Sequence, residues 1–169
     1  MATKVIQAIP GMPKPVTESE VERFLLEGKL NIQIATIDEE GYPIVQPIWF
    51  VFNRDTRKIY SGTPKATRKI ENIKRNPDKV HFSIDDENFP YKGVKGRAEA
   101  RIIQGSNEIL PILETINMKY LGTNDHPIAQ MILDNARKGE QVVIELTPKF
   151  FSMGFCKGTI TIKGGQNRI

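Results

Sequence analysis

The feature that most constrains the fold is a run of three expected β-strands, over residues 30–63, that are joined only by turns. From Leu30 the hydrophobic period changes to two, with Ile32 and Ile34 on the same side as Leu30. The sequence DEEG then predicts a hairpin turn, and NRD turns the chain again before a strand at 58–63. A doubly wound α/β fold is disfavoured, because it needs helices of about ten residues or more between most strands.

The second of these strands, residues 43–52, carries the apolar run IVQPIWFVF. We expect it to be buried on both faces. Pro47 lies inside the run and cannot donate a hydrogen bond to a neighbouring strand. The proline therefore indicates a sheet edge, a bulge, or backbone that faces a ligand.

Four further segments read as strands, at residues 80–85, 94–103, 141–146 and 150–155. Gly93 and Gly96 predict a bulge or bend of the kind that barrel corners need. Strands joined in this way predict a mainly β fold with flanking helices, a small antiparallel barrel of the Greek-key kind.

Three helices are expected around these strands, in addition to a short one within residues 59–77. The first begins at a TESE capping box, formed by Thr17 and Glu20, and ends near Gly28. The second spans residues 106–121 with Ser106 as its cap, and Pro111 predicts that its regular part begins near that residue. The third spans residues 127–138.

The length of 169 residues fits one domain, which we expect over residues 17–157. Several prolines in residues 1–16 predict an extended arm, and the polar, glycine-rich residues 158–169 predict a tail that frays.

Composition excludes several classes of function. The single Cys156 excludes an internal disulfide, and the separation of His81 from His126 offers no metal site. No apolar run suits a membrane span or a signal peptide, so we expect a cytoplasmic protein. The net charge of +4 falls short of what a committed nucleic-acid binder needs.

The segment IYSGTPKATRKIENIKRNP, residues 59–77, is the one whose residue order predicts a ligand. A strand end followed by a helix start is a ready anion site, because backbone N–H groups and the helix dipole point at the gap. Hydroxyls of Thr63 and Thr67, with the cations of Arg68 and Lys69, would complete a phosphate site. The expected apolar side of this helix consists of Ala66, Ile70 and Ile73.

The same pattern also fits a simpler interpretation, in which the basic residues only form the solvated face of a surface helix. These residues are Lys65, Arg68, Lys69, Lys74 and Arg75. Residue order alone leaves both interpretations open.

Four motifs together resemble the pyridoxamine 5′-phosphate oxidase-like, FMN-binding split-barrel superfamily. They are DEEGYPIVQPIWFVFN, IYSGT, TRKIENIKRNP and YKGVKGRAEARI. The resemblance implies a split β-barrel, an FMN cofactor and a homodimer that holds the cofactor between its subunits. It leaves the small-molecule substrate and the catalytic residues unknown.

The resemblance also implies which residues bind the cofactor. The phosphate would be held at the end of the third strand and the start of the following helix, with Thr67 in the place of the motif's serine. The second strand would line the flavin ring, and the partner subunit would contribute the start of the fifth strand. The residues at these positions are Gly62, Thr63, Thr67, Arg68 and Lys69 for the phosphate, Gln46, Pro47, Ile48 and Trp49 for the ring, and Tyr91 and Lys92 for the partner's segment.

Two departures from the true oxidase speak against its activity. Gln46 stands where that enzyme has an arginine, and the C-terminal FFSMGFCKGTITIKGG has no counterpart of its segment rich in Trp, Arg and His. We therefore expect an oxidoreductase with a different substrate.

Several alternatives stay open at this point. Some relatives bind the deazaflavin F420, whose acidic tail would suit Lys65 and Lys74. A haem-binding relative, a flavin-storage or flavin-sensing protein and an RNA-binding barrel that stacks bases on Tyr60 and Phe82 are the non-enzymatic alternatives. The carboxylates at 85–87 are interpreted as a turn, not as an acid–base pair.

Overall fold

The computed structural model describes residues 4–7, 16–89 and 91–155. Calls on the remaining residues, including the tail at 158–169 and most of the arm at 1–16, lie outside this range. The described strands are β1 (Lys4–Gln7), β2 (Ile32–Ile37), β3 (Pro43–Ile48), β4 (Val51–Asn53), β5 (Lys58–Pro64), β6 (Val80–Asp86), β7 (Lys92–Ile103), β8 (Gln141–Pro148) and β9 (Phe150–Phe155). The described helices are α1 (Glu18–Leu26), α2 (Arg68–Arg75), α3 (Ser106–Leu121) and α4 (Pro127–Arg137).

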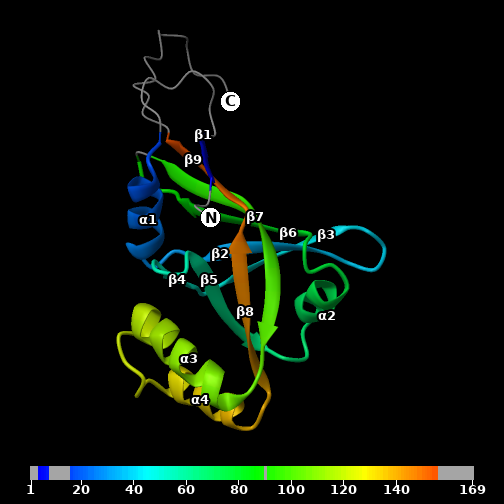
Figure 1. Ribbon diagram of the computed structural model, residues 1–169. Coiled ribbons are helices and arrows are strands. Elements are labelled where there is room, and N and C mark those ends of the chain that lie inside the picture. The colour runs from blue at the N-terminus through cyan, green and yellow to red at the C-terminus, as the bar shows by residue number, and fades with distance from the viewer. Residues whose placement is uncertain (1–3, 8–15, 90, 156–169) are drawn as a thin grey trace, which may run out of the picture.

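All nine of these strands join one sheet, in which seven follow the order β3-β2-β6-β7-β8-β5-β4. β9 pairs with β7, and β1 pairs with β9 in the one parallel pairing among the described strands. The sheet curls so far that β3 comes close to β5 (Figure 1). A mainly antiparallel, split barrel with flanking helices confirms the predicted fold class.

Two apolar clusters hold the elements together. The larger lies on the inner face of the sheet and includes residues from α1 and α2, such as Leu25 and Ile73. The smaller lies where α3 and α4 pack side by side on the outer face, around Leu113 and Leu133 (Figure 1). No helix in the described ranges has the length and apolar character that crossing a membrane requires.

The partner of β7 changes at Gly96. Residues 92–95 of β7 pair with β9, whereas residues 98–103 pair with β8. A Cβ at Gly96 would clash with the Phe150 carbonyl and the Phe82 ring, so only glycine permits this approach. The register between β6 and β7 is unbroken, which means that the predicted feature is a corner without a bulge.

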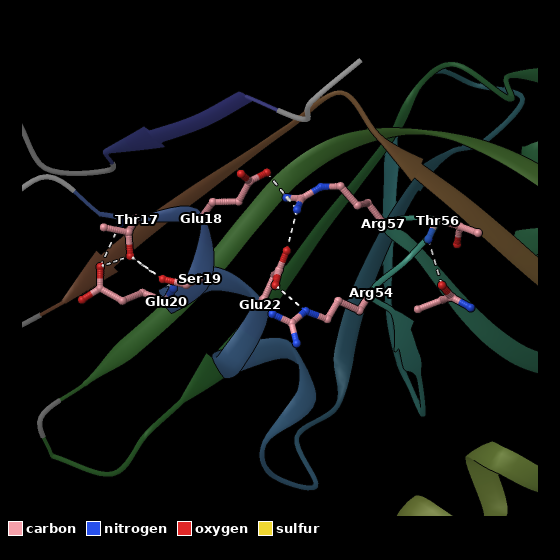
Figure 2. A network of polar contacts seen from close by, with 9 residues as sticks. Thr17, Glu18, Ser19, Glu20, Glu22, Arg54, Thr56 and Arg57 are labelled. Atoms are coloured by element: carbon pink, nitrogen blue, oxygen red, sulfur yellow. Dashed lines mark hydrogen bonds and ion pairs between the residues drawn. The ribbon is translucent and has the colours of Figure 1, made fainter.

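The start of α1 confirms the predicted capping box. The Thr17 side chain accepts from the Glu20 backbone N–H, and the Glu20 carboxylate accepts from the Thr17 N–H at 2.8 Å (Figure 2). From the β4–β5 turn, Arg57 reaches Glu18 at 2.8 Å and Glu22 at 2.7 Å. These contacts tie the first turns of α1 to the sheet.

The expectation of one strand over residues 43–52, buried on both faces, was wrong. The segment divides into β3 and β4, and the side chain of Val45 on β3 is 59% exposed. The physical reason is that β3 is an edge strand whose only described partner is β2. An edge position was one of the interpretations of Pro47, which lies there opposite Gln33.

The expectation for α3 was wrong at its start. Its N-cap is Gly105, with φ of 97°, and Ser106 is already helical. Pro111 lies inside the helix on its exposed side. Burial of Ile109 and Leu113 on the opposite side stabilises a helix that continues through the proline.

Candidate functional site

The N-terminus of α2 follows directly from the end of β5. Thr63 is buried on β5, and the extended backbone of Thr67 forms the N-cap of α2. The Thr67 hydroxyl donates to the Pro64 carbonyl at 3.1 Å and makes no capping hydrogen bond. As a result, the N–H groups of Arg68 and Lys69 have no hydrogen-bond partner within the described residues.

Lys69 brings a cation to this helix start. Its Nζ donates to the Thr63 Oγ1 at 3.0 Å, and burial lowers the pKa of the ammonium. Among the described residues no carboxylate pairs with it. A half-buried ammonium held only by a neutral hydroxyl favours the approach of an anion.

The cations of α2 differ between its two ends. In the last turn, Lys74 pairs with Glu71 at 2.8 Å and Arg75 pairs with Glu39 at 3.2 Å. Arg68, in the first turn, makes no ion pair with any residue in the part of the chain that is described. The interpretation of a solvated helix face therefore fits the last turn better than the first.

The apolar side of α2 differs in one residue from the expectation. Ile70 and Ile73 are buried, but Ala66 is exposed because it precedes the helix. The buried Asn72 takes the third inward position, and its Nδ2 donates to the Thr36 hydroxyl of β2 at 3.0 Å. This bond fixes α2 against the sheet.

Gly62 and Thr63 face opposite sides of β5. A Cβ at Gly62 would clash with Leu113 of α3. Gly62 thus allows α3 to pack closely on β5, on the side of the sheet away from the Thr63 hydroxyl.

The predicted ring-lining residues of β3 alternate in the same way. Gln46 lies opposite the buried Ile34, on the inner face, and its Oε1 is buried without a hydrogen-bond partner. Ile48 shares that face and packs against the larger apolar cluster, whereas Pro47 is exposed. Trp49 follows β3 and stacks on Tyr120 of α3, with ring centroids 4.8 Å apart and planes 6° apart.

Tyr91 and Lys92 lie far from α2 within one chain. Ala100 of β7 donates its N–H to the Pro77 carbonyl just beyond α2, and Lys92 lies eight residues away, about 26 Å along the strand. The Tyr91 hydroxyl donates to Asp85 at 2.8 Å, and this bond raises its pKa. One chain therefore does not bring these two residues to the Lys69 site.

Sequence reasoning missed the role of Tyr120. Its hydroxyl donates to the Leu30 carbonyl at 2.6 Å and accepts from the Phe50 N–H at 3.1 Å, while burial raises its pKa to about 12. The neighbouring Lys119 lies 3.8 Å from the Phe50 ring centroid, and burial lowers its pKa to about 8. No sequence signal marks these contacts, because only the packing of α3 brings them together.

Sequence reasoning also missed a hollow of about 370 Å³ between the β2–β3 turn, residues 38–40, and one side of α2. We call it the acidic hollow. Four carboxylates line it against two guanidiniums, those of Arg68 and Arg75, a net charge of −2. The DEEG turn was visible in the sequence, but its position beside α2 was not.

Comparison with known proteins places this geometry among solved split barrels. A conserved hypothetical protein from Mycobacterium tuberculosis is 17% identical, with a TM-score of 0.71 over 89% of this chain and 94% of that one. An F420 reductase is 27% identical, with a TM-score of 0.61 over 77% and 94%. A haem storage protein from Vibrio cholerae is 20% identical, with a TM-score of 0.60 over 80% and 92%.

No curated protein matches the chain significantly. The family model described as pyridoxamine 5′-phosphate oxidase matches residues 18–152, a range that runs from the first residue of α1 into β9. It includes the whole helix start with Thr63, Arg68 and Lys69. The chain therefore belongs to the pyridoxamine 5′-phosphate oxidase family.

Proposed function

We propose that this protein is a flavin-dependent oxidoreductase that holds the phosphate of FMN at the N-terminus of α2. The observation that carries the proposal is the half-buried Lys69 ammonium, which lies on the Thr63 hydroxyl beside two unpaired backbone N–H groups. A phosphate group would accept from those N–H groups and from Lys69, and Arg68 could bind two of its oxygens.

The rest of the site also fits a polar, planar cofactor. The Gln46 Oε1 on β3 and the Ser61 Oγ on β5 are both buried without a hydrogen-bond partner, and the two strands lie close together. Buried polar atoms of this kind normally have partners, so a ligand with polar edges would satisfy them. The stacked rings of Trp49 and Tyr120 stiffen the backbone that follows Pro47.

Bound FMN would supply the hydride and electron transfer. In this proposal the residues of the chain bind and orient: Lys69 and Arg68 fix the phosphate, and β3 contributes backbone and Gln46 beside the ring. We also propose a homodimer in which Tyr91 and Lys92 of a second copy complete the site. Their distance from Lys69 within one chain supports this arrangement. No residue is assigned a catalytic role.

The second candidate cofactor is F420. The 27% identity to an F420 reductase, over most of both chains, favours it. Haem, flavin without turnover and RNA remain non-enzymatic alternatives. Binding of RNA would weaken steeply with salt, whereas a specific flavin site would lose far less affinity.

The test is a visible absorption and fluorescence spectrum of the purified protein, before and after incubation with FMN or F420 and desalting. Retention of a flavin or deazaflavin spectrum is the expected result, and substrate screening with the loaded protein would follow. A protein that retains neither cofactor would contradict the proposal. Haem and RNA binding should then be measured on the same sample.

A further inference from the structure

The acidic hollow shares Arg68 with the proposed phosphate site, so it is the ground on which a longer cofactor would have to rest. Most of its charges are already committed. Glu39 pairs with Arg75, Glu71 pairs with Lys74, and one oxygen of Asp38 accepts from the Glu40 and Tyr42 N–H groups at 3.0 and 2.8 Å. Lys74 is therefore not free to receive an acidic tail, contrary to the suggestion from sequence.

A second observation concerns Asn72, which lines the same hollow. Its side chain is 1% exposed, and because its Nδ2 is held by Thr36, its Oδ1 is left buried without a partner. A free amide oxygen can only accept a hydrogen bond, so it would repel the oxygen atoms of a carboxylate. Asn72 therefore adds to the preference that the net charge of −2 sets.

FMN and F420 differ at this place. The phosphate ends the FMN molecule, whereas in F420 the chain continues from the phosphate into an acidic tail. We propose that the acidic hollow selects for FMN, because it admits a terminal phosphate on Arg68 and Lys69 and repels a polycarboxylate that continues past it. This inference rests on the proposed function and names the cofactor that the site takes.

The experiment compares the dissociation constants of FMN and F420, measured by fluorescence titration of the full-length protein. One variant carries Glu39→Gln, Glu40→Gln and Glu71→Gln, which changes the net charge of the hollow from −2 to about +1 and releases Lys74 and Arg75. The control carries Glu27→Gln, Glu108→Gln and Glu114→Gln, three exposed carboxylates that do not line the hollow. Circular dichroism checks that both variants fold.

We expect the wild-type protein to bind FMN more tightly than F420. The ratio of the F420 to the FMN dissociation constant should fall by about tenfold in the hollow variant and stay unchanged in the control. Raising the salt concentration should reduce the wild-type ratio, since salt screens exposed charges.

A wild-type protein that binds F420 more tightly, or a ratio that the hollow variant leaves unchanged, would overturn the selection while the flavin site stands. If the wild-type protein binds neither cofactor, the proposed function fails and the selection fails with it. Comparing the ratio, instead of one affinity, removes the general gain that any anion would have from the lost carboxylates.

Discussion

The N-termini of α1 and α2 begin in the same way and end in opposite states. Each has a threonine at its N-cap with extended backbone. At α1, Thr17 and Glu20 satisfy each other's N–H groups, and Arg57 neutralises Glu18 and Glu22 (Figure 2). The Thr67 hydroxyl of α2 turns away, and the first turn carries cations where the helix dipole favours anions.

This difference separates a helix start that stabilises the fold from one that is open to a ligand. The chain satisfies α1 with its own side chains, whereas the unpaired groups of α2 oppose folding until an anion binds. The predictions below test the difference, beginning with the largest effect.

The largest effect is expected from Arg68→Ala combined with Lys69→Ala. Each charge-assisted hydrogen bond contributes about 1.5–3 kcal/mol, so loss of both should weaken cofactor binding at least about 100-fold. Fluorescence titration measures the affinity. Lys74→Ala, on the same helix but paired with Glu71, is the matched control and should change it less than about threefold. Equal losses in both variants would remove the distinction between the two ends of α2.

The next effect concerns stability and should be the same in both helices. Leu25 of α1 and Ile73 of α2 are both buried, so Leu25→Ala and Ile73→Ala should each reduce the free energy of unfolding by about 2–5 kcal/mol. Denaturant titration of the cofactor-free protein measures it. A much smaller loss at Ile73 would mean that α2 as a whole, and not only its first turn, is loosely held.

The two N-cap threonines should differ by about 1 kcal/mol. Thr17→Ala removes a capping box and should cost about 0.5–2 kcal/mol. Thr67→Ala removes no capping bond and should cost only a few tenths, about 0.3 kcal/mol. Thermal unfolding of both variants checks the difference, and equal costs would contradict it.

Closing the open helix start should exchange binding for stability. In Thr67→Asp a carboxylate can cap the free N–H groups, and the cofactor-free protein should gain about 0.5–1 kcal/mol. The same carboxylate repels phosphate, so cofactor affinity should fall about fivefold or more. Thr67→Asn, a cap without charge, separates the two effects: it should keep most of the stability and lose less affinity.

The smallest effect follows from the lowered pKa of Lys69. Below that pKa the folded, cofactor-free protein holds a charged and partly desolvated ammonium, which opposes folding. As pH rises from the folded pKa toward 10.5, the folded state loses this proton before the unfolded state does, so stability rises. The stability of the wild-type protein should therefore gain on that of Lys69→Met between pH 7 and 10. A difference that stays constant with pH would refute the assignment.

Local patterns in the sequence were sufficient for most of the fold. The capping box at Thr17 and the period of two in β2, β6 and β7 depend on neighbours within a few residues. The failures had distant causes. Exposure of β3 depends on its edge position in the sheet, and the continuation of α3 through Pro111 depends on packing against β5 and β8.

The site divides along the same line. Residue order located the helix start at Arg68 and Lys69, but it could not distinguish a free cation from a paired one. Arg75 is neutralised by Glu39, 36 positions away in the chain, and the β2–β3 turn brings them together. The pairing of Gly62 with α3 and the distance of Lys92 from α2 also needed the folded structure.

The pairing of β5 with β8 has a consequence for how the protein is made. The strand that leads into the phosphate helix is bonded to β4 on one side and, on the other, to a strand about 80 residues later. During synthesis, β5 therefore keeps an open edge until residues 141–148 have left the ribosome. Such distant pairing slows folding and exposes strand edges to other chains. The segment proposed to hold the cofactor is thus completed late, and a chain that stops before β8 would be the form most prone to aggregate.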